Sequence, residues 1–240
     1  MFRFLHTADI HASKSRKDST VKTFDLLIEK AKEHHVNCVI LAGDTWDSTV
    51  TATEASGFTS VMRKMEELQA VTSVYVLYGT PGHEPEGCLD CFGILPNVTV
   101  IDRPSVLDMG HGILGVALPE PRLSHYPGSV QDKYDAIQKE FRAFLSDAQK
   151  TFEKEGYSRK ILMYHGDVEG GVRQNGMTVP KGESALPVSL LKKYRFDYGA
   201  LGHIHCPQQI PGTNCWYPGS PCPKGFGEPH EGLIKLVEFE

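Results

Sequence analysis

The chain has 240 residues, of which 40% are hydrophobic and 23% are charged, and its formal net charge at pH 7 is −5. This size and composition are those of a globular protein that can bury a substantial core, and six cysteines in a chain of this length do not make a disulfide scaffold. No apolar run approaches the ~20 residues that a membrane span needs, so we expect a cytoplasmic protein that does not engage a membrane. The net charge argues neither for nor against a nucleic-acid partner.

The first part of the chain alternates apolar runs with amphipathic stretches. Phe2 to Thr7 is the first expected strand, and apolar residues then recur at helical spacing from Thr20, a suitable N-cap, to His34. The pattern repeats as a strand, a helix and a strand at Val36 to Leu41, Thr53 to Leu68 and Val71 to Tyr78. This βαβαβ order predicts parallel strands joined by right-handed crossovers.

The middle of the chain changes character, with short β segments punctuated by glycine that are suited to a second sheet. These segments are Val98 to Ile101, Ser105 to Leu107 and Gly112 to Leu118. A long helix over Asp132 to Phe152 and a strand over Ile161 to Tyr164 come next. The later expected elements are a long loop over residues 167–186, a helix over Pro187 to Tyr194, a strand over Tyr198 to Leu201, and closing strands at Ile210, Trp216-Tyr217 and Leu233 to Phe239.

Acidic and histidine residues recur where the expected strands end. The candidates are Asp9, His11, Asp44, Asp47, His83, Glu84, His165, His203 and His205. In open α/β sheets the carboxyl ends of the strands form the edge where sites are built. Side chains two apart in an extended segment project to the same side, so His203 and His205 can reach one cluster. We therefore predict that these strand ends meet and hold two divalent metal ions.

Eleven histidines make chance proximity to aspartate common. A lone histidine is usually a core or surface residue, and we interpret His6, His34, His35, His111, His125 and His230 in that way. The candidate set differs because its members follow five separate strand ends in a fixed order: Asp-x-His, Gly-Asp-x-x-Asp, Gly-x-x-x-His-Glu, His and Gly-His-x-His.

This ordered set resembles the calcineurin-like metallophosphoesterase superfamily over nearly the whole chain. The segments most similar to the SbcD-type DNA repair exonucleases are Leu5 to His11, Gly43 to Asp47, Asp197 to His205 and Tyr217 to Pro221. The resemblance implies an α/β fold with a two-sheet β-sandwich core flanked by helices in four layers (αββα). We expect residues 1–240 to be a single metallophosphoesterase domain, without the separate DNA-capping domain and ATPase-binding segment into which the SbcD type continues.

The resemblance also implies ligands for two metals that share Asp44. They are Asp9, His11 and His205 for the first metal, and His165 and His203 for the second. Carboxylate and imidazole ligands without thiolate suit Mn²⁺, Fe and Zn²⁺, and we expect Mn²⁺, with Fe, Zn²⁺ and Mg²⁺ as alternatives. Two carboxylates against two divalent ions leave about two positive charges for a phosphodiester.

Three further residues have roles near these metals. By resemblance, His83 faces the scissile phosphate as a general acid or hydrogen-bond donor. We expect Asp47 to fix its loop rather than to bind metal directly. Glu84 either orients His83 or is a solvated loop carboxylate.

The sequence departs from the superfamily pattern just before His83. The superfamily has an asparagine there, whose amide oxygen binds the second metal, whereas this chain has Gly82. The second metal is then left with Asp44, His165 and His203. We expect it to bind weakly, or only with substrate, unless Thr80 or a backbone carbonyl substitutes.

We predict a metal-dependent phosphodiesterase, specifically a DNA exonuclease or endonuclease of the SbcD type, with DNA as substrate and an SbcC-type ATPase as the partner that the resemblance implies. A phosphatase or a cyclic-nucleotide phosphodiesterase is the alternative, because the same metal core serves all of these enzymes. A non-enzymatic alternative is a catalytically weakened binding module, which the missing asparagine suggests.

Overall fold

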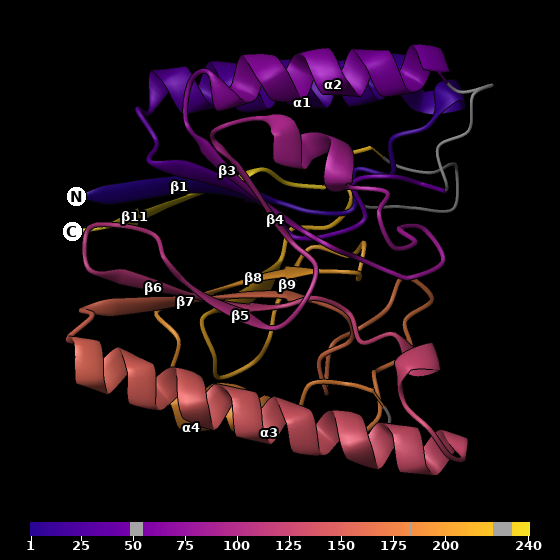
Figure 1. Ribbon diagram of the computed structural model, residues 1–240, viewed down its shortest axis with the longest axis vertical. Coiled ribbons are helices and arrows are strands. Elements are labelled where there is room, and N and C mark those ends of the chain that lie inside the picture. Colours follow the sequence, from indigo (N-terminus) through magenta and orange to yellow (C-terminus); the bar gives the residue numbers. More distant parts are fainter. Residues whose placement is uncertain (49–54, 183, 223–231) are drawn as a thin grey trace.

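The fold of the chain is a four-layer sandwich of two sheets and the helices that cover them (Figure 1). The computed structural model describes residues 1–48, 55–182, 184–222 and 232–240. The helices α1 and α2 lie on the outer face of one sheet, and α3 and α4 lie on the outer face of the other. This arrangement confirms the predicted α/β sandwich with flanking helices.

The first sheet has the strand order β11-β1-β2-β3-β4. Its strands are β1 (Phe2–Thr7), β2 (Cys38–Leu41), β3 (Ser73–Leu77), β4 (Val98–Ile101) and β11 (Lys235–Phe239), and the helices on it are α1 (Lys17–Glu33) and α2 (Ala55–Gln69). The strands β1 to β4 are parallel, and β11 is antiparallel to β1. Every residue of β2 is buried, as expected for an inner parallel strand covered on both faces.

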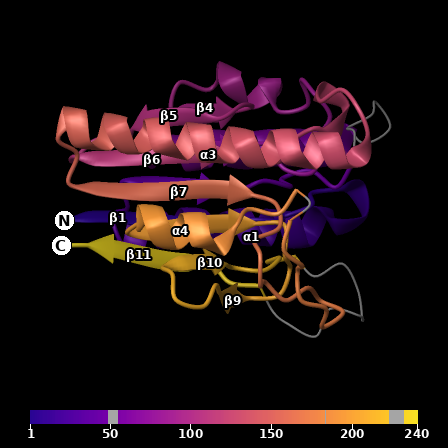
Figure 2. The same cartoon turned by 90° about the horizontal axis from the view of Figure 1, so that it is seen from below.

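The second sheet has the strand order β5-β6-β7-β8-β10-β9, and its inner pairs are parallel. Its strands are β5 (Ser105–Asp108), β6 (Ile113–Leu118), β7 (Arg159–His165), β8 (Tyr198–Gly202), β9 (Gln208–Gln209) and β10 (Cys215–Tyr217). The helices on it are α3 (Val130–Glu155) and α4 (Val188–Tyr194), which Figure 2 shows lying along the strands. Short 3₁₀ helices occur at η1 (Lys14–Arg16), η3 (Asp90–Ile94) and η4 (Leu123–His125).

Three expectations about the elements need correction. Segment 98–101 joins the first sheet as β4, because its backbone pairs with β3 in parallel register. Thr20 is not an N-cap: η1 leads directly into α1, and Thr20 is buried inside the helix. Ile210 follows β9 rather than lying within it. The predicted helix start at Thr53 lies outside the described residues, and the described helix begins at Ala55.

The inner faces of the two sheets pack against each other in one apolar layer. Phe4, Ile40 and Leu77 come from the first sheet, and Met163 and Ala200 come from the second. Beside this layer, the end of β8 approaches the end of β2 so closely that a Cβ atom on Gly202 would lie 1.9 Å from the carbonyl oxygen of Ala42. Glycine at this position therefore allows the carboxyl ends of the two sheets to touch.

No helix in the described ranges combines the length and the apolar character that a membrane crossing requires. The chain termini lie at one end of the sandwich, and the carboxyl ends of the parallel strands lie at the other end (Figures 1 and 2).

His6 is a buried histidine on β1 that joins the two sheets, which confirms its interpretation as a core residue. Its Nδ1 lies 2.9 Å from the hydroxyl of Tyr198, and its Nε2 lies 3.2 Å from the carbonyl oxygen of Leu201. A carbonyl can only accept, so Nε2 carries the proton and Nδ1 accepts from Tyr198. Burial lowers the pKa of His6 to about 3, against the raising effect of the Leu201 carbonyl.

This lowered pKa predicts a loss of stability in acid that depends on His6. Below pH 6.5 the unfolded chain protonates His6, whereas the folded chain does not until about pH 3, so the free energy of unfolding falls across that window as the pH falls. We expect the stability advantage of the wild type over His6→Gln to shrink by about 2–3 kcal/mol between pH 7.5 and pH 4.5. Urea unfolding of both proteins at these two pH values measures this difference, and a constant difference would contradict the prediction.

Candidate metal centre

Five parallel strands end at one edge of the sandwich, and each carries a predicted site residue either as its last residue or in the loop that follows. The loops after β1, β2, β3 and β8 carry Asp9 and His11, Asp44, His83, and His203 and His205, while His165 is the last residue of β7. The structure brings all nine candidates to this edge. The side chains form overlapping groups in which nitrogen and oxygen atoms lie within 4.8 Å of one another.

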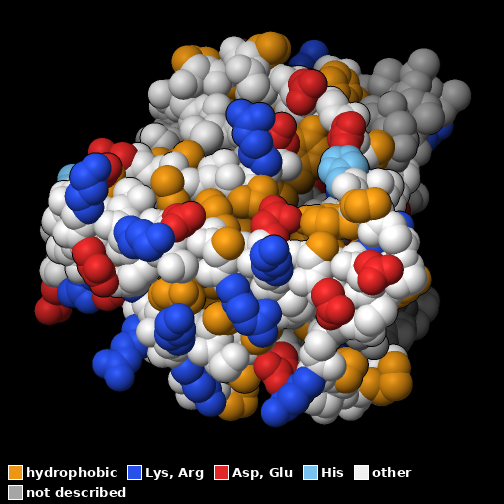
Figure 3. All heavy atoms as spheres, turned by 60° about the horizontal axis from the view of Figure 1, so that its bottom comes forward, with side chains coloured by type: hydrophobic (Ala, Val, Ile, Leu, Met, Phe, Trp, Pro, Cys, Tyr) orange, Lys and Arg blue, Asp and Glu red, His pale blue; other side chains and the backbone are white. Residues whose placement is uncertain are grey.

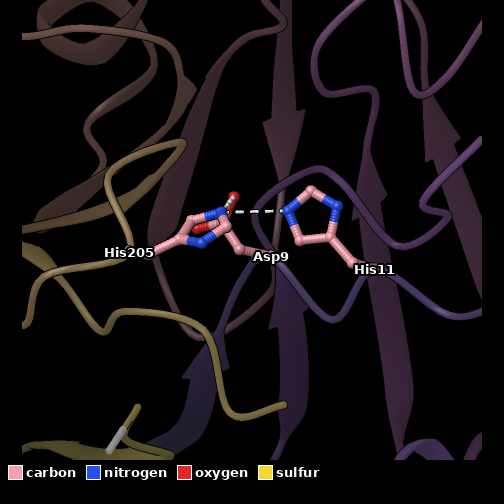
Figure 4. A group of neighbouring side chains, drawn as sticks. All are labelled: Asp9, His11 and His205. Carbon is pink, nitrogen blue, oxygen red and sulfur yellow. Dashed lines mark hydrogen bonds and ion pairs between the residues drawn. The ribbon is translucent and has the colours of Figure 1, made fainter. Parts of the chain in front are cut away.

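The first group consists of Asp9, His11 and His205 (Figure 4). The Nε2 atoms of His11 and His205 are 3.0 Å apart, and Nε2 of His205 lies 4.0 Å from Oδ1 of Asp9. The backbone N–H of His203 donates to the Asp9 carboxylate, with 3.0 Å to each oxygen. Three side chains from two sheets thus direct their ligand atoms to one point.

Asp44 lies between this group and a second one. Its Oδ2 atom is 3.7 Å from Nε2 of His11 and 3.5 Å from Nε2 of His165. Its Oδ1 atom accepts a hydrogen bond of 2.6 Å from the backbone N–H of Thr80. One carboxylate therefore faces imidazoles from both halves of the centre.

The second group consists of His165, His203 and Glu120, and the sequence analysis missed Glu120. The Oε2 atom of Glu120 lies 3.4 Å from Nδ1 of His203 and 3.7 Å from Nε2 of His165. Glu120 is the second residue after β6, which is itself a buried strand. A carboxylate just past another strand end was the available signal, but the recognised motifs all centre on aspartate or histidine.

The hydrogen bonds of His165 show that this pocket suits a cation. Its Nδ1 lies 2.7 Å from the carbonyl oxygen of Ala42, so Nδ1 must carry a proton. In a neutral ring, Nε2 would direct a lone pair at the Asp44 carboxylate, and two buried acceptors that face each other need a positive charge between them. Burial lowers the pKa of His165, but the negative charges of Asp44 and Asp9 outweigh it and raise this pKa to about 10. A divalent ion would supply the same charge, so the donor set fits a metal.

Several of these residues have a backbone conformation that is rare for residues other than glycine. The φ angles of Asp9, His11, Asp44 and His203 are 56°, 49°, 49° and 106°. Such conformations cost on the order of 1–3 kcal/mol each and persist where the surroundings enforce them. Here the loops after β1 and β2 bond to each other, with His11 N–H donating to the Asp44 carbonyl at 2.9 Å.

Asp47 and His83 lie next to the first group. Oδ1 of Asp47 is 3.4 Å from Nδ1 of His11 and 2.8 Å from Nη2 of Arg16, so its carboxylate links η1 to the ligand loop. The backbone carbonyl of Asp47 accepts a hydrogen bond of 2.5 Å from Nδ1 of His83. The His83 and His11 rings are 4.7 Å apart, which places His83 at the wall of the site.

Glu84 differs from both of its predicted roles. Its carboxylate is buried, and it accepts hydrogen bonds from the backbone N–H groups of Gly79 at 2.6 Å and Trp46 at 3.1 Å. It therefore joins the loops that follow β2 and β3 instead of orienting His83 or facing solvent. Burial raises the pKa of Glu84 to about 7, and the nearby Asp44 carboxylate adds to this shift.

The segment from Tyr217 to Pro221 supports the site from the second sheet. The hydroxyl of Ser220 donates to the carbonyl of Asp9 at 2.7 Å, and the hydroxyl of Tyr217 donates to the carbonyl of Gly166 at 2.8 Å. Asp167 also lies near the site, which the sequence analysis did not predict. Its Oδ1 lies 3.8 Å from Nε2 of His203, and its carboxylate pairs with Arg173.

Comparisons with known proteins identify the family of this chain. Residues 2–207 match the family described as calcineurin-like phosphoesterase. The chain is 25% identical to the DNA double-strand break repair protein Mre11 of Methanopyrus kandleri and 26% identical to a subunit of the nuclease SbcCD of Escherichia coli K12, in each case over 99% of this chain. It spans 54% and 65% of the length of these two relatives.

A solved structure shows a similar fold at much lower sequence identity. The crystal structure of a dimetal phosphatase from Danio rerio superposes with a TM-score of 0.59 and 13% identity, covering 92% of this chain and 88% of that one. At this identity the likeness supports the sandwich architecture alone.

The position of Asp44 predicts that metal affinity depends on its charge. Binding to the folded state alone stabilises a protein by about 2.7 kcal/mol when the ligand is at 100 times its Kd. We expect Mn²⁺ to raise the melting temperature of the chelator-treated wild type and to leave that of Asp44→Asn nearly unchanged, because the variant loses the carboxylate that both imidazole groups face.

A thermal melt with and without Mn²⁺ measures this effect. Asp102→Asn is the matched control, since Asp102 is an exposed aspartate that follows β4 of the same sheet, and it should respond like the wild type. An equal response of Asp44→Asn would contradict the assignment.

Proposed function

Because this chain belongs to the calcineurin-like phosphoesterase family, we propose that it is a metal-dependent phosphodiesterase that cleaves DNA, as a nuclease of the SbcD type. Two relatives that match nearly the whole chain are named as part of a nuclease and as a DNA double-strand break repair protein, which supports DNA as the substrate. Cleavage of DNA, pairing with an ATPase, and a cytoplasmic location are parts of this proposal.

The observation that carries the proposal is the Asp44 carboxylate between His11 and His165. Hydrolysis of a phosphodiester by a two-metal centre needs two cation sites close enough to share a ligand. In the proposal, Asp9, His11, His205 and Asp44 hold one ion, and Asp44, His165 and His203 contribute to the other. Bound ions at these sites would polarise the phosphoryl oxygens and make a water molecule more acidic. Mn²⁺ is the proposed metal, since the donors are oxygen and imidazole nitrogen.

His83 is proposed to move a proton during the reaction. Because its Nδ1 donates to the Asp47 carbonyl, its other ring nitrogen, Nε2, is the atom available to exchange a proton. In its protonated form, Nε2 can donate to the oxygen that leaves phosphorus. The hydrogen bond from Nδ1 holds the ring in the tautomer and orientation that this step needs.

The face that carries α3 and α4 does not suggest a separate DNA-binding surface. On the face that carries α3 and α4, lysine and arginine side chains are interspersed with aspartate and glutamate (Figure 3). Such a mixture gives a weak net field for a polyanion. We therefore place the proposed DNA contact at the edge that carries the metal ligands.

A substrate panel tests the proposal. We expect the Mn²⁺-loaded protein to cleave single- or double-stranded DNA and bis-p-nitrophenyl phosphate faster than p-nitrophenyl phosphate or a cyclic nucleotide. Turnover of the monoester without turnover of the diester would contradict the nuclease proposal and indicate a phosphatase. Absence of both turnover and bound transition metal would support a binding module.

The role of His83 predicts a loss of turnover without a loss of metal. Removal of a general acid or base typically costs 10²- to 10⁴-fold in rate. We expect His83→Gln to lower kcat on bis-p-nitrophenyl phosphate at least ~100-fold while binding Mn²⁺ like the wild type. His125→Gln is the control, because His125 pairs with Glu86 on the surface at 2.8 Å and should keep full activity. Full activity in His83→Gln would disprove the proposed proton transfer.

A further inference from the structure

Glu120 occupies a place in the centre that the sequence motifs do not account for. Pro119 and Pro121 flank it, so the backbone on both sides is restricted where β6 leaves the sheet. Its side chain is 23% exposed. Among the described residues, its ion pairs are with His165 and His203. This partly buried carboxylate therefore faces two imidazoles instead of a lysine or an arginine.

The nearest arginine in the sequence has other partners. Arg122 donates from Nη2 to the backbone carbonyl of Glu84 at 2.6 Å, and its Nε lies 4.0 Å from Glu86. The guanidinium of Arg122 therefore holds the loop after β3. The negative charge of Glu120 faces the imidazoles of the metal centre instead.

The hydroxyl of Thr80 marks the point on which the second group converges. Its Oγ1 lies 3.1 Å from both Asp44 Oδ2 and Glu120 Oε2, 3.3 Å from His165 Nε2 and 3.4 Å from His203 Nδ1. The hydroxyl has one proton and can donate to only one of these four atoms at a time. Two carboxylate oxygens and two imidazole nitrogens thus surround one small polar point, which is a donor set of the kind that divalent transition metals prefer.

We propose that Glu120 is a direct ligand of the second ion, in the place expected for an asparagine amide. The complete set is then Asp44, Glu120, His165 and His203. The ion takes the place that the Thr80 hydroxyl fills among these four side chains, and the backbone N–H of Thr80 positions Asp44 through its Oδ1 atom. This inference rests on the proposed function in that it concerns the same metal centre. It changes the expectation of a weak second site, which counted only three ligands: with four, the second ion binds without substrate.

The added carboxylate also changes the charge that the substrate meets. Asp9, Asp44 and Glu120 against two divalent ions leave about one net positive charge, where two carboxylates would leave about two. A phosphodiester carries one negative charge, and a phosphomonoester carries close to two at neutral pH. Glu120 therefore favours a diester over a monoester at this centre.

A Mn²⁺ titration of the chelator-treated full chain tests the assignment. By isothermal titration calorimetry, we expect two sites in the wild type, and in Glu120→Ala, which leaves no oxygen ligand, one site of unchanged Kd and a second that is at least ~10-fold weaker. Glu86→Ala is the control, because Glu86 is an exposed acid that pairs with His125, and it should match the wild type. A second site in Glu120→Ala within twofold of the wild-type Kd, or a single site in the wild type, would overturn the proposal.

Electron paramagnetic resonance gives a readout that needs neither turnover nor an affinity fit. At two equivalents of Mn²⁺, the wild type should show the spectrum of a coupled pair, and Glu120→Ala should show that of isolated Mn²⁺. A coupled pair in Glu120→Ala would count against the ligand. Circular dichroism in chelator checks that the variant is folded.

Substrate selectivity then separates this inference from the proposed function. At saturating Mn²⁺, the ratio of diester to monoester turnover should fall at least threefold in Glu120→Ala, and an unchanged ratio would refute the charge argument. If Glu120→Ala loses one ion but the wild type cleaves no DNA or diester, the nuclease proposal fails and the ligand assignment stands. If the wild type cleaves DNA and Glu120→Ala still binds two ions as tightly as the wild type, only the ligand assignment fails.

Discussion

A buried carboxylate that faces two imidazoles is the constraint on which this structure depends. Oδ2 of Asp44 lies within 3.7 Å of the Nε2 atoms of His11 and His165. The other ring nitrogen of His165, Nδ1, donates a hydrogen bond to a backbone carbonyl. Acceptors cannot be buried against each other without a cation between them. The same charge requirement that makes the apoprotein bind protons here makes the centre suited to metal ions.

The two-sheet architecture supplies the ligands from both sides of this carboxylate. Asp9, His11 and Asp44 belong to the first sheet, and the second sheet contributes its histidines from the ends of β7 and β8. Contact between the sheets at Gly202 and Ala42 brings these ends within reach of each other. A larger residue than glycine in that place would push apart the two halves of the centre.

The loops around the ligands are held mainly by hydrogen bonds to the backbone. Glu84 accepts hydrogen bonds from the N–H groups of two loops, and Ser220 donates to the carbonyl of Asp9. The loops that carry the left-handed residues Asp9, His11 and Asp44 also hydrogen-bond to each other through their backbones. These contacts explain why strained φ angles can persist at the site. Ligand positions set in this way need little rearrangement when ions bind, which is the arrangement that precise catalysis requires.

The sequence by itself determined the alternation of strands and helices and the strand ends that carry Asp9, Asp44 and His203, because the periodicity of apolar residues and the motif residue next to each strand are local. The two-sheet sandwich came from the family resemblance of those motifs. Tertiary structure alone decided that β4 pairs in the first sheet, that Glu84 holds two loops, and that Glu120 faces His165 and His203. Those outcomes depend on contacts between segments distant in the chain, which no local pattern encodes. Glu120, which lies between two prolines, faces His165 only because β6 pairs with β7 in the second sheet.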